Sequence, residues 1–182
     1  MHIILKKWQK LIQEIEDYEG EITSIWLFQK FLDWSIQWKV AKDISVKESY
    51  NSYLQYFEYF TARHLSEYPF LHDKEFIDDL VEYDLIRSKE TNYKYDYIFS
   101  KISNLMWRLI TIETSIECPN CKEGNYLLLT DKKLSNIYHS CDLCGNLQKL
   151  TQEREYLDNK KLYPISREQL NLLQEQGVPP RE

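Results

Sequence analysis

Glycine is scarce in this sequence, which has only four among 182 residues: Gly20, Gly124, Gly145 and Gly177. Phosphate-binding loops and the nucleophile elbow of hydrolases need several glycines at fixed spacing, so the sequence excludes both motifs. Histidine is equally rare, and the four histidines are too scattered to form a metalloprotease or triad pattern: His2, His64, His72 and His139. With no nucleophile or cofactor motif nearby, we expect a protein that is not an enzyme.

The sequence also lacks a long apolar run and a positive net charge. No uninterrupted apolar stretch approaches the length of a membrane span, and at the N-terminus lysines follow a very short apolar run, unlike the order of a secretory signal. We therefore expect a soluble cytoplasmic protein with reduced thiols and no membrane partner. The net charge of -6 argues against a general nucleic-acid binder, because lysine and arginine make most phosphate contacts.

Aromatic residues are abundant and concentrate in the first 116 residues, which hold 22 of the 26. Apolar residues recur there at steps of three and four, which predicts amphipathic helices. The first ends before Gly20, and the others cover 21–42, 45–65, 74–89 and 95–114. Ser45 with Glu48 fits a capping box, and Asp73 is the expected cap of the fourth helix.

The pattern changes at Cys118. Residues 126–129 and 136–139 are short strand-like runs separated by a polar turn, and 147–150 is a candidate third strand. Ser166 and Gln169 repeat the capping-box spacing, so we expect a short helix before Gly177. The predicted fold class is mainly α: an N-terminal bundle of about five helices over 1–116, a small β-hairpin module over 117–151 and an extension with a short helix over 152–182.

All four cysteines lie in two Cys-x-x-Cys pairs, Cys118 with Cys121 and Cys141 with Cys144. This spacing suits a tetrahedral zinc site. The segment 117–151 resembles the zinc-ribbon family, whose two knuckles bind one metal ion and flank a β-hairpin. The resemblance implies a structural zinc, but it leaves the function open, because zinc ribbons occur in transcription factors, ribosomal proteins, enzymes and scaffolds. Gly145 follows the second pair, where the turn favours positive φ, whereas Lys122 occupies that place in the first pair.

Other uses of the four cysteines remain open at this point. Two disulfides or four free thiols are the alternatives for a cytoplasmic chain, and an iron centre of the rubredoxin type has similar knuckles. His139 lies near Cys141, but four cysteines already complete a ligand set. We expect His139 to face solvent from a strand or to donate a hydrogen bond near the site.

The cysteine-rich segment has no basic field. Residues 117–154 contain five basic and five acidic side chains. Lys132 and Lys133 at the expected hairpin tip are candidates for phosphate contacts, although a solvated turn explains them more simply. A nucleic-acid-binding or transcription-associated zinc ribbon is therefore the alternative function.

Residues 73–84 carry most of the net negative charge, with six acids against one lysine. The acids are Asp73, Glu75, Asp78, Asp79, Glu82 and Asp84. Helical spacing places most of them on one face, and like charges at such steps oppose helix formation. A solvated helix face is the plainer explanation, and a divalent-metal site is a weaker third one. The functional hypothesis is a docking surface for a basic protein partner, as in an immunity protein or antitoxin that inhibits a nuclease.

Overall fold

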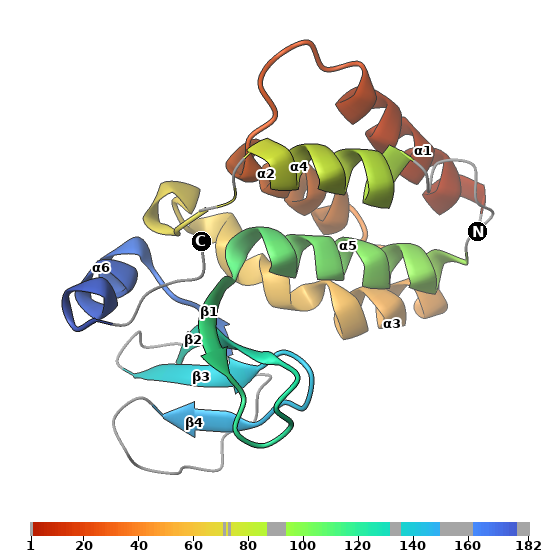
Figure 1. Ribbon diagram of the computed structural model, residues 1–182. Helices are drawn as coiled ribbons and strands as arrows, with labels where there is room; N and C mark the ends of the chain where they lie inside the picture. The colour runs from red at the N-terminus through yellow and green to blue at the C-terminus, as the bar shows by residue number, and fades with distance from the viewer. Residues whose placement is uncertain are drawn as a thin grey trace. The chain divides into compact units, whose positions relative to one another are not determined.

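The computed structural model describes residues 2–70, 72, 74–86, 94–131, 136–149 and 162–177. The chain divides into two compact units. The first comprises Met1–Leu65 and Leu71–Leu109, and the second comprises Ser66–Phe70 and Ile110–Glu182. The described part is mostly helical, with a small antiparallel sheet in the C-terminal half (Figure 1). None of the described helices has the length and apolar character needed to cross a membrane.

Unit 1 contains the helices predicted from the aromatic-rich part of the sequence. They are α1 (His2–Glu16), α2 (Ser24–Ile36), α3 (Ile44–Tyr53), the 3-10 segment η1 (Gln55–Ala62), α4 (Lys74–Asp79), the π-helical segment η3 (Leu80–Leu85) and α5 (Tyr95–Ile110). A short 3-10 turn, η2 (Leu65–Glu67), follows η1. The apolar faces of these helices form a core of interlocking rings. Phe28, for example, lies 6.1 Å from Phe57 and 5.5 Å from Phe60, both edge to face.

Helix boundaries differ from the predictions where a stronger local interaction is present. The predicted capping box at Ser45 is wrong, because Asp43 is the N-cap of α3 and its carboxylate accepts from the amides of Ser45 and Val46. The helix predicted over 21–42 is shorter, since Thr23 caps its start and turns replace it after Ile36. The predicted cap Asp73 lies outside the described residues.

Unit 2 is built on a five-stranded antiparallel sheet. Its strands are β1 (Ile112–Glu117), β2 (Asn125–Asp131), β3 (Ile137–Cys141), β4 (Leu147–Lys149) and β5 (Leu162–Pro164), in the order β1-β2-β3-β4, with β5 also paired to β2. The predicted hairpin is confirmed, with Tyr126 opposite Cys141 and Leu128 opposite His139. The helix predicted to reach Thr114 is corrected, because it ends at Ile110 and the β-branched run that follows forms β1.

One short helix, α6 (Arg167–Glu175), packs on this sheet. The predicted capping box is present, with Gln169 N donating to Ser166 Oγ at 3.2 Å and Ser166 N donating to Gln169 Oε1 at 2.9 Å. The buried Gln169 amide also donates to Thr130 Oγ1 on β2 at 3.0 Å. Apolar side chains complete the contact: Ile112, Leu128, Ile165, Leu170 and Leu173. This cluster gives unit 2 a core separate from its cysteine cluster.

Candidate metal centre

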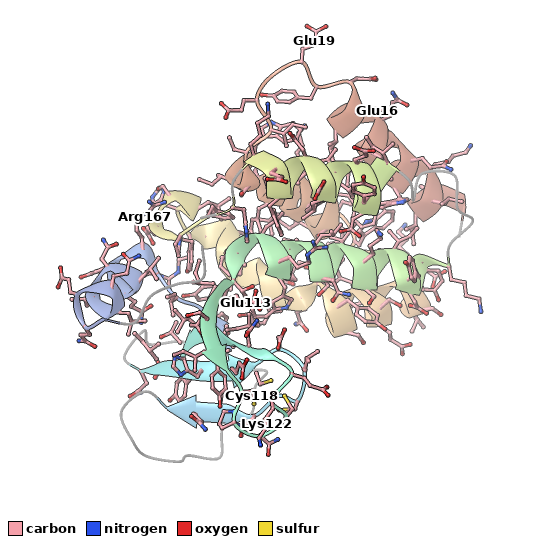
Figure 2. The ribbon with its side chains drawn as sticks, viewed as in Figure 1. Glu16, Glu19, Glu113, Cys118, Lys122 and Arg167 are labelled. Atoms are coloured by element: carbon pink, nitrogen blue, oxygen red, sulfur yellow. The ribbon has the colours of Figure 1, made fainter. Side chains whose placement is uncertain are left out.

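The four cysteine sulfurs form one cluster between the ends of the hairpin. All four Sγ atoms lie within 4.8 Å of one another, and the Sγ atoms of Cys118 and Cys144, like those of Cys121 and Cys141, are 3.6 Å apart. Figure 2 shows sulfur atoms gathered beside Cys118 and Lys122. A disulfide bond is about 2.05 Å long, so none is present. In a tetrahedral site with metal–sulfur bonds of about 2.3 Å, sulfurs are about 3.8 Å apart. The cluster therefore fits a single metal ion.

The two knuckles that hold these sulfurs have the same backbone turn. The amide of Lys122 donates to the carbonyl of Cys118 at 2.8 Å, and the amide of Gly145 donates to the carbonyl of Cys141 at 3.1 Å. Both residues after the second cysteine have positive φ, 58° for Lys122 and 66° for Gly145. The prediction for Gly145 is thus confirmed. Lys122 adopts the same left-handed conformation without the freedom of glycine, so the first turn is strained.

Gly124 has a different role from the glycine expected after a knuckle. Its carbonyl accepts from the amide of Cys118 at 2.8 Å, which closes the first knuckle. A Cβ at this position would lie 2.7 Å from the Sγ of Cys141 and 2.5 Å from the Oδ1 of Asp142. Real Cβ contacts are never this short, so only glycine lets the first knuckle approach the second this closely.

Hydrogen-bond donors surround the sulfurs. The Cys144 amide donates to the Sγ of Cys141 at 3.4 Å, and Asn120 Nδ2 donates to the Sγ of Cys144 at 3.5 Å. Asn146 Nδ2 lies 3.9 Å from the Sγ of Cys118 and donates to the Tyr126 hydroxyl at 2.9 Å. Four thiolates and one divalent cation would together carry a charge of about -2, and these donors stabilise that charge.

The same donors change the acidity of the thiols. Burial raises the pKa of Cys118, but the backbone amides of Cys121 and Asn120 and the neighbouring thiols lower it to about 6. Burial also raises the pKa of Cys141. Of these two thiols, Cys118 therefore ionises more readily than Cys141. Thiolates are the form of cysteine that binds metal.

His139 lies beside the cluster but does not face solvent, contrary to the first of the two expectations for it. Its ring is buried and stacks on Tyr126, with ring centroids 5.0 Å apart. Burial lowers its pKa, which favours the neutral imidazole. The Nε2 atom has no hydrogen-bond partner among the described residues. His139 therefore supports the site by packing against Tyr126, a ring that also contacts Cys118 and Cys141.

The second predicted site, the acidic segment, forms α4 and η3. The structure exposes Glu75, Asp78, Asp79 and Glu82, while Ile77, Leu80, Val81 and Leu85 are buried. None of these four carboxylates has an ion-pair partner within the part of the chain that the structure describes. Tyr83, on the same segment, is 51% exposed.

Asp84 differs from the other predicted acids. Its carboxylate accepts a 2.5 Å hydrogen bond from Arg108 Nη1 on α5 and lies 3.9 Å from Lys101 Nζ. Both cations come from the same unit, so Asp84 joins η3 to α5. The structure brings Glu75, Asp78, Asp79 and Glu82 together on one exposed segment, whereas Asp84 is neutralised within the fold.

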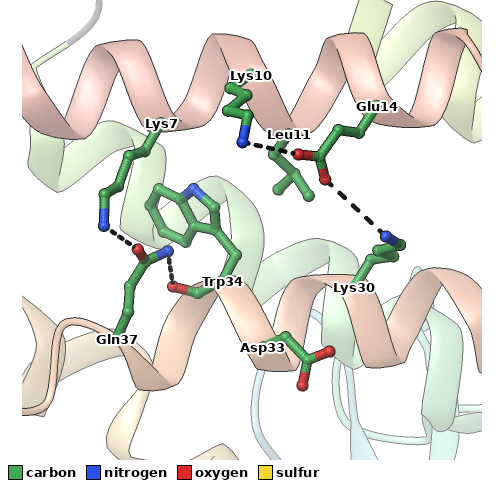
Figure 3. Close-up of a pocket in the computed structure, with 8 residues that line it drawn as sticks. All are labelled: Lys7, Lys10, Leu11, Glu14, Lys30, Asp33, Trp34 and Gln37. Carbon is green, nitrogen blue, oxygen red and sulfur yellow. Dashed lines mark hydrogen bonds and ion pairs between the residues drawn. The ribbon is translucent and has the colours of Figure 1, made fainter.

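A pocket of about 350 Å³ lies between α1 and α2 in unit 1 (Figure 3). Its floor contains the indole of Trp34, and its rim contains lysines and acids: Lys7, Lys10, Lys30, Glu14 and Asp33. Glu14 lies 3.4 Å from Lys10 and 3.9 Å from Lys30, so two of the three lysines share one carboxylate as their ion-pair partner. Sequence reasoning missed this pocket, because its residues also fit the ordinary pattern of an amphipathic helix pair.

Three residues of the metal centre had no assigned role at the sequence level: Asn120, Tyr126 and Asn146. The Asn residues lie within or directly after the knuckles, and this position is the one signal that points to them as donors to the sulfurs. Lys132 and Lys133, the predicted phosphate contacts, lie outside the described residues. Comparison of the chain with protein-family models, curated proteins and solved structures found no match.

Proposed function

We propose that this protein is a non-catalytic binding protein that docks a basic protein partner through an acidic surface, while a zinc ion held by Cys118, Cys121, Cys141 and Cys144 stabilises unit 2. The acidic surface consists of Glu75, Asp78, Asp79, Glu82 and Tyr83. The observation that carries the proposal is the exposure of four carboxylates that lack cationic partners among the described residues. A nuclease is a partner of suitable charge, and the protein would then act as an inhibitor of the immunity or antitoxin type.

The structural role of zinc follows from the ligand set. Four cysteines complete a tetrahedral shell, so no position remains open for a substrate. Cys118 follows β1, Cys121 precedes β2, Cys141 is the last residue of β3, and Cys144 lies between β3 and β4. A metal ion at this point would join the segments that connect these strands. In unit 2 it would add to a small apolar core around α6.

The acidic surface is costly to the free protein. Like charges at helical steps of three and four oppose each other by a few tenths of a kcal/mol per pair, and the described fold offers them no cation. Asp84 on the same segment is paired with Arg108, so this segment can accommodate an internal ion pair. A basic partner would relieve the repulsion on binding and would associate faster through electrostatic steering.

Tyr83 and the π-helical turn support this location. An exposed tyrosine beside charged residues is typical of protein interfaces, because its ring supplies contact area and its hydroxyl supplies a hydrogen bond. The π-helical segment Leu80–Leu85 carries both Glu82 and Tyr83. Such segments are rare and frequently occur at functional sites.

The test is affinity capture with the purified full-length protein from native lysate, followed by charge reversal. We expect a captured partner with a basic isoelectric point that is lost when Glu75, Asp78, Asp79 and Glu82 are changed to Lys. The matched control reverses four exposed acids elsewhere: Glu19, Glu21, Glu48 and Glu175. Capture that survives the first reversal, or is lost equally in the control, would refute the acidic surface as the docking site.

The alternative function, nucleic-acid binding by the cysteine-rich unit, depends on Lys132 and Lys133. Neutralising both lysines would then remove a binding step that weakens steeply with salt. No observation on the described residues of unit 2 favours this alternative over protein binding.

A further inference from the structure

The charge of this protein is strongly polarised toward the start of α1 and the turn between α2 and α3. Residues 2–10 and 37–47 contain six lysines and a single acid, Asp43. The lysines are Lys6, Lys7, Lys10, Lys39, Lys42 and Lys47. The remainder of the chain has 17 basic against 28 acidic residues, so it carries -11 while these two stretches carry +5. A protein of net charge -6 thus has one markedly basic region.

The two lysine-bearing stretches meet at one end of unit 1. Helices α1 and α2 are antiparallel: Lys30 lies 3.9 Å from Glu14, and Lys7 donates to Gln37 Oε1. The Lys7 ammonium also lies 5.1 Å from the Trp38 ring centroid. Ile3 lies about one helical turn before Lys7 on α1, so it lies at the end of the helix pair where the chain continues past Trp38 after α2. Helix α3 begins at Ile44, and its start lies at the same end of the unit as the start of α1 (Figure 1).

Large aliphatic side chains are exposed at this end. Val40 is 81% exposed and Ile44 is 74% exposed, which are the highest values for large apolar side chains in the described part of the chain, and Ile3 is 61% exposed. Three apolar side chains that face solvent together cost free energy in the isolated protein and mark a contact surface.

Three lysines of this region are free to contact a partner. Lys39 pairs with Glu58 at 2.5 Å, Lys10 pairs with Glu14, and Lys7 is held by Gln37. Lys6, Lys42 and Lys47 are exposed and have no acidic partner among the described residues. Asp43, the one acid within the two stretches, uses its carboxylate to cap α3. The free cations are thus interspersed with the exposed aliphatic side chains.

We propose that this lysine-rich end, defined by Ile3, Lys6, Val40, Lys42, Ile44 and Lys47, binds the surface of an anionic lipid bilayer. The ammonium groups contact phosphate headgroups, and Val40 and Ile44 enter the boundary between headgroups and acyl chains. The expectation of no membrane partner rested on the missing transmembrane segment, which has no bearing on surface binding.

The composition of the surface favours lipid over nucleic acid as the anionic partner. Nucleic-acid sites combine cations with arginine or with aromatic rings that stack on bases. Here the exposed apolar groups are aliphatic, Trp38 is buried, and the two stretches contain no arginine. Aliphatic side chains gain free energy in a bilayer boundary, whereas a phosphate backbone offers them no apolar contact.

Vesicle co-sedimentation with the full-length protein tests the proposal, using phosphatidylcholine vesicles with or without about one-third phosphatidylglycerol. We expect binding only to the anionic vesicles. The double variant Lys42→Gln/Lys47→Gln should lower the partition coefficient by about 25-fold, since each lysine contributes about fivefold. Lys30→Gln/Lys74→Gln removes the same charge outside the lysine-rich end and should change binding much less.

A second variant separates lipid from other anionic partners. Val40→Ser/Ile44→Ser keeps every charge and changes only exposed side chains, so the fold should be retained; circular dichroism checks this. We expect it to lower vesicle binding by about tenfold or more. The proposal would be overturned if the wild-type protein does not bind anionic vesicles. It would also be overturned if the two lysine double variants lose vesicle binding equally, or if the serine variant binds vesicles as well as wild type does. Tighter binding to duplex DNA or RNA than to vesicles would overturn it as well. The acidic surface keeps its own test, because neither Lys42→Gln/Lys47→Gln nor Val40→Ser/Ile44→Ser changes a residue of that surface.

Discussion

Replacing Gly124 by alanine tests whether close contact between the knuckles is needed for the metal centre. The new Cβ would lie 2.7 Å from the Sγ of Cys141, whereas ordinary contacts begin at 3.4 Å. One knuckle must therefore move by about 0.7 Å, and side-chain atoms of Asp142 and Leu143, at 2.5 and 3.1 Å, also obstruct the methyl group. Metal–ligand distances tolerate only about 0.2 Å, so the movement exceeds what four fixed ligands can absorb.

We expect Gly124→Ala to lower zinc affinity by about 10- to 100-fold and to destabilise unit 2 by about 1–3 kcal/mol. Competition with a chromophoric chelator measures the affinity, and chemical denaturation measures the stability. The control is Gly177→Ala: Gly177 has positive φ of 81°, but a Cβ there meets nothing within 4 Å. It should leave zinc affinity unchanged. An unchanged affinity in Gly124→Ala would refute the proposed need for close knuckle contact.

Two further predictions concern strain and an ion pair. Lys122→Gly should stabilise the zinc-bound protein by about 0.5–1 kcal/mol in denaturant titration. Glycine removes the cost of about 1–2 kcal/mol that a left-handed backbone imposes on lysine, and the entropic cost that it adds is smaller. A destabilised variant would contradict the strain inferred from the positive φ. Glu58 accepts from Lys39 at 2.5 Å and from the Tyr50 hydroxyl at 2.9 Å, and the Lys39 hydrogen bond, opposed by burial and assisted by Tyr50, lowers its pKa. The ionised carboxylate should contribute about 1 kcal/mol to stability above the unfolded pKa of about 4.3, and this contribution should disappear as pH falls through the lower folded pKa. Glu58→Gln should therefore be less stable than wild type at neutral pH and should approach the wild-type stability at acidic pH. A stability difference that does not shrink on acidification would show that the carboxylate charge is not responsible.

The sequence predicted those features that depend on local spacing. The cysteine cluster, the β2–β3 hairpin, the capping box at Ser166 and the positive φ of Gly145 each depend on a few neighbouring residues, and the structure has all four. Helical periodicity also located the helices of unit 1, because an amphipathic face must be buried in any compact arrangement.

The errors arose where two patterns overlapped. Leu109 and Ile112 continue the helical spacing of α5, but the run from Thr111 to Ile116 alternates β-branched residues, and pairing with β2 decides in favour of a strand. The Ser45–Glu48 motif satisfied a capping rule, yet Asp43 lies two residues earlier and starts the helix first.

Other features cannot be derived from sequence spacing at all. The π-helical turn at Leu80–Leu85 and the pairing of Asp84 with Arg108 depend on which helices pack together, and such contacts join residues distant in the chain. The close approach of Gly124 to Cys141 likewise exists only once both knuckles have formed. These long-range contacts explain why Asp84 was grouped with the docking acids.

The most direct test of the account is metal analysis of the purified protein, combined with thermal melting before and after chelation. The account predicts about one zinc per chain, bound by Cys118, Cys121, Cys141 and Cys144, and a lower melting temperature after the metal is removed. Substituting Cys118 by serine should reproduce the effect of chelation. A protein that contains no metal and melts unchanged with a chelator would contradict the proposed zinc site, and stoichiometric iron in place of zinc would contradict the identity of the metal.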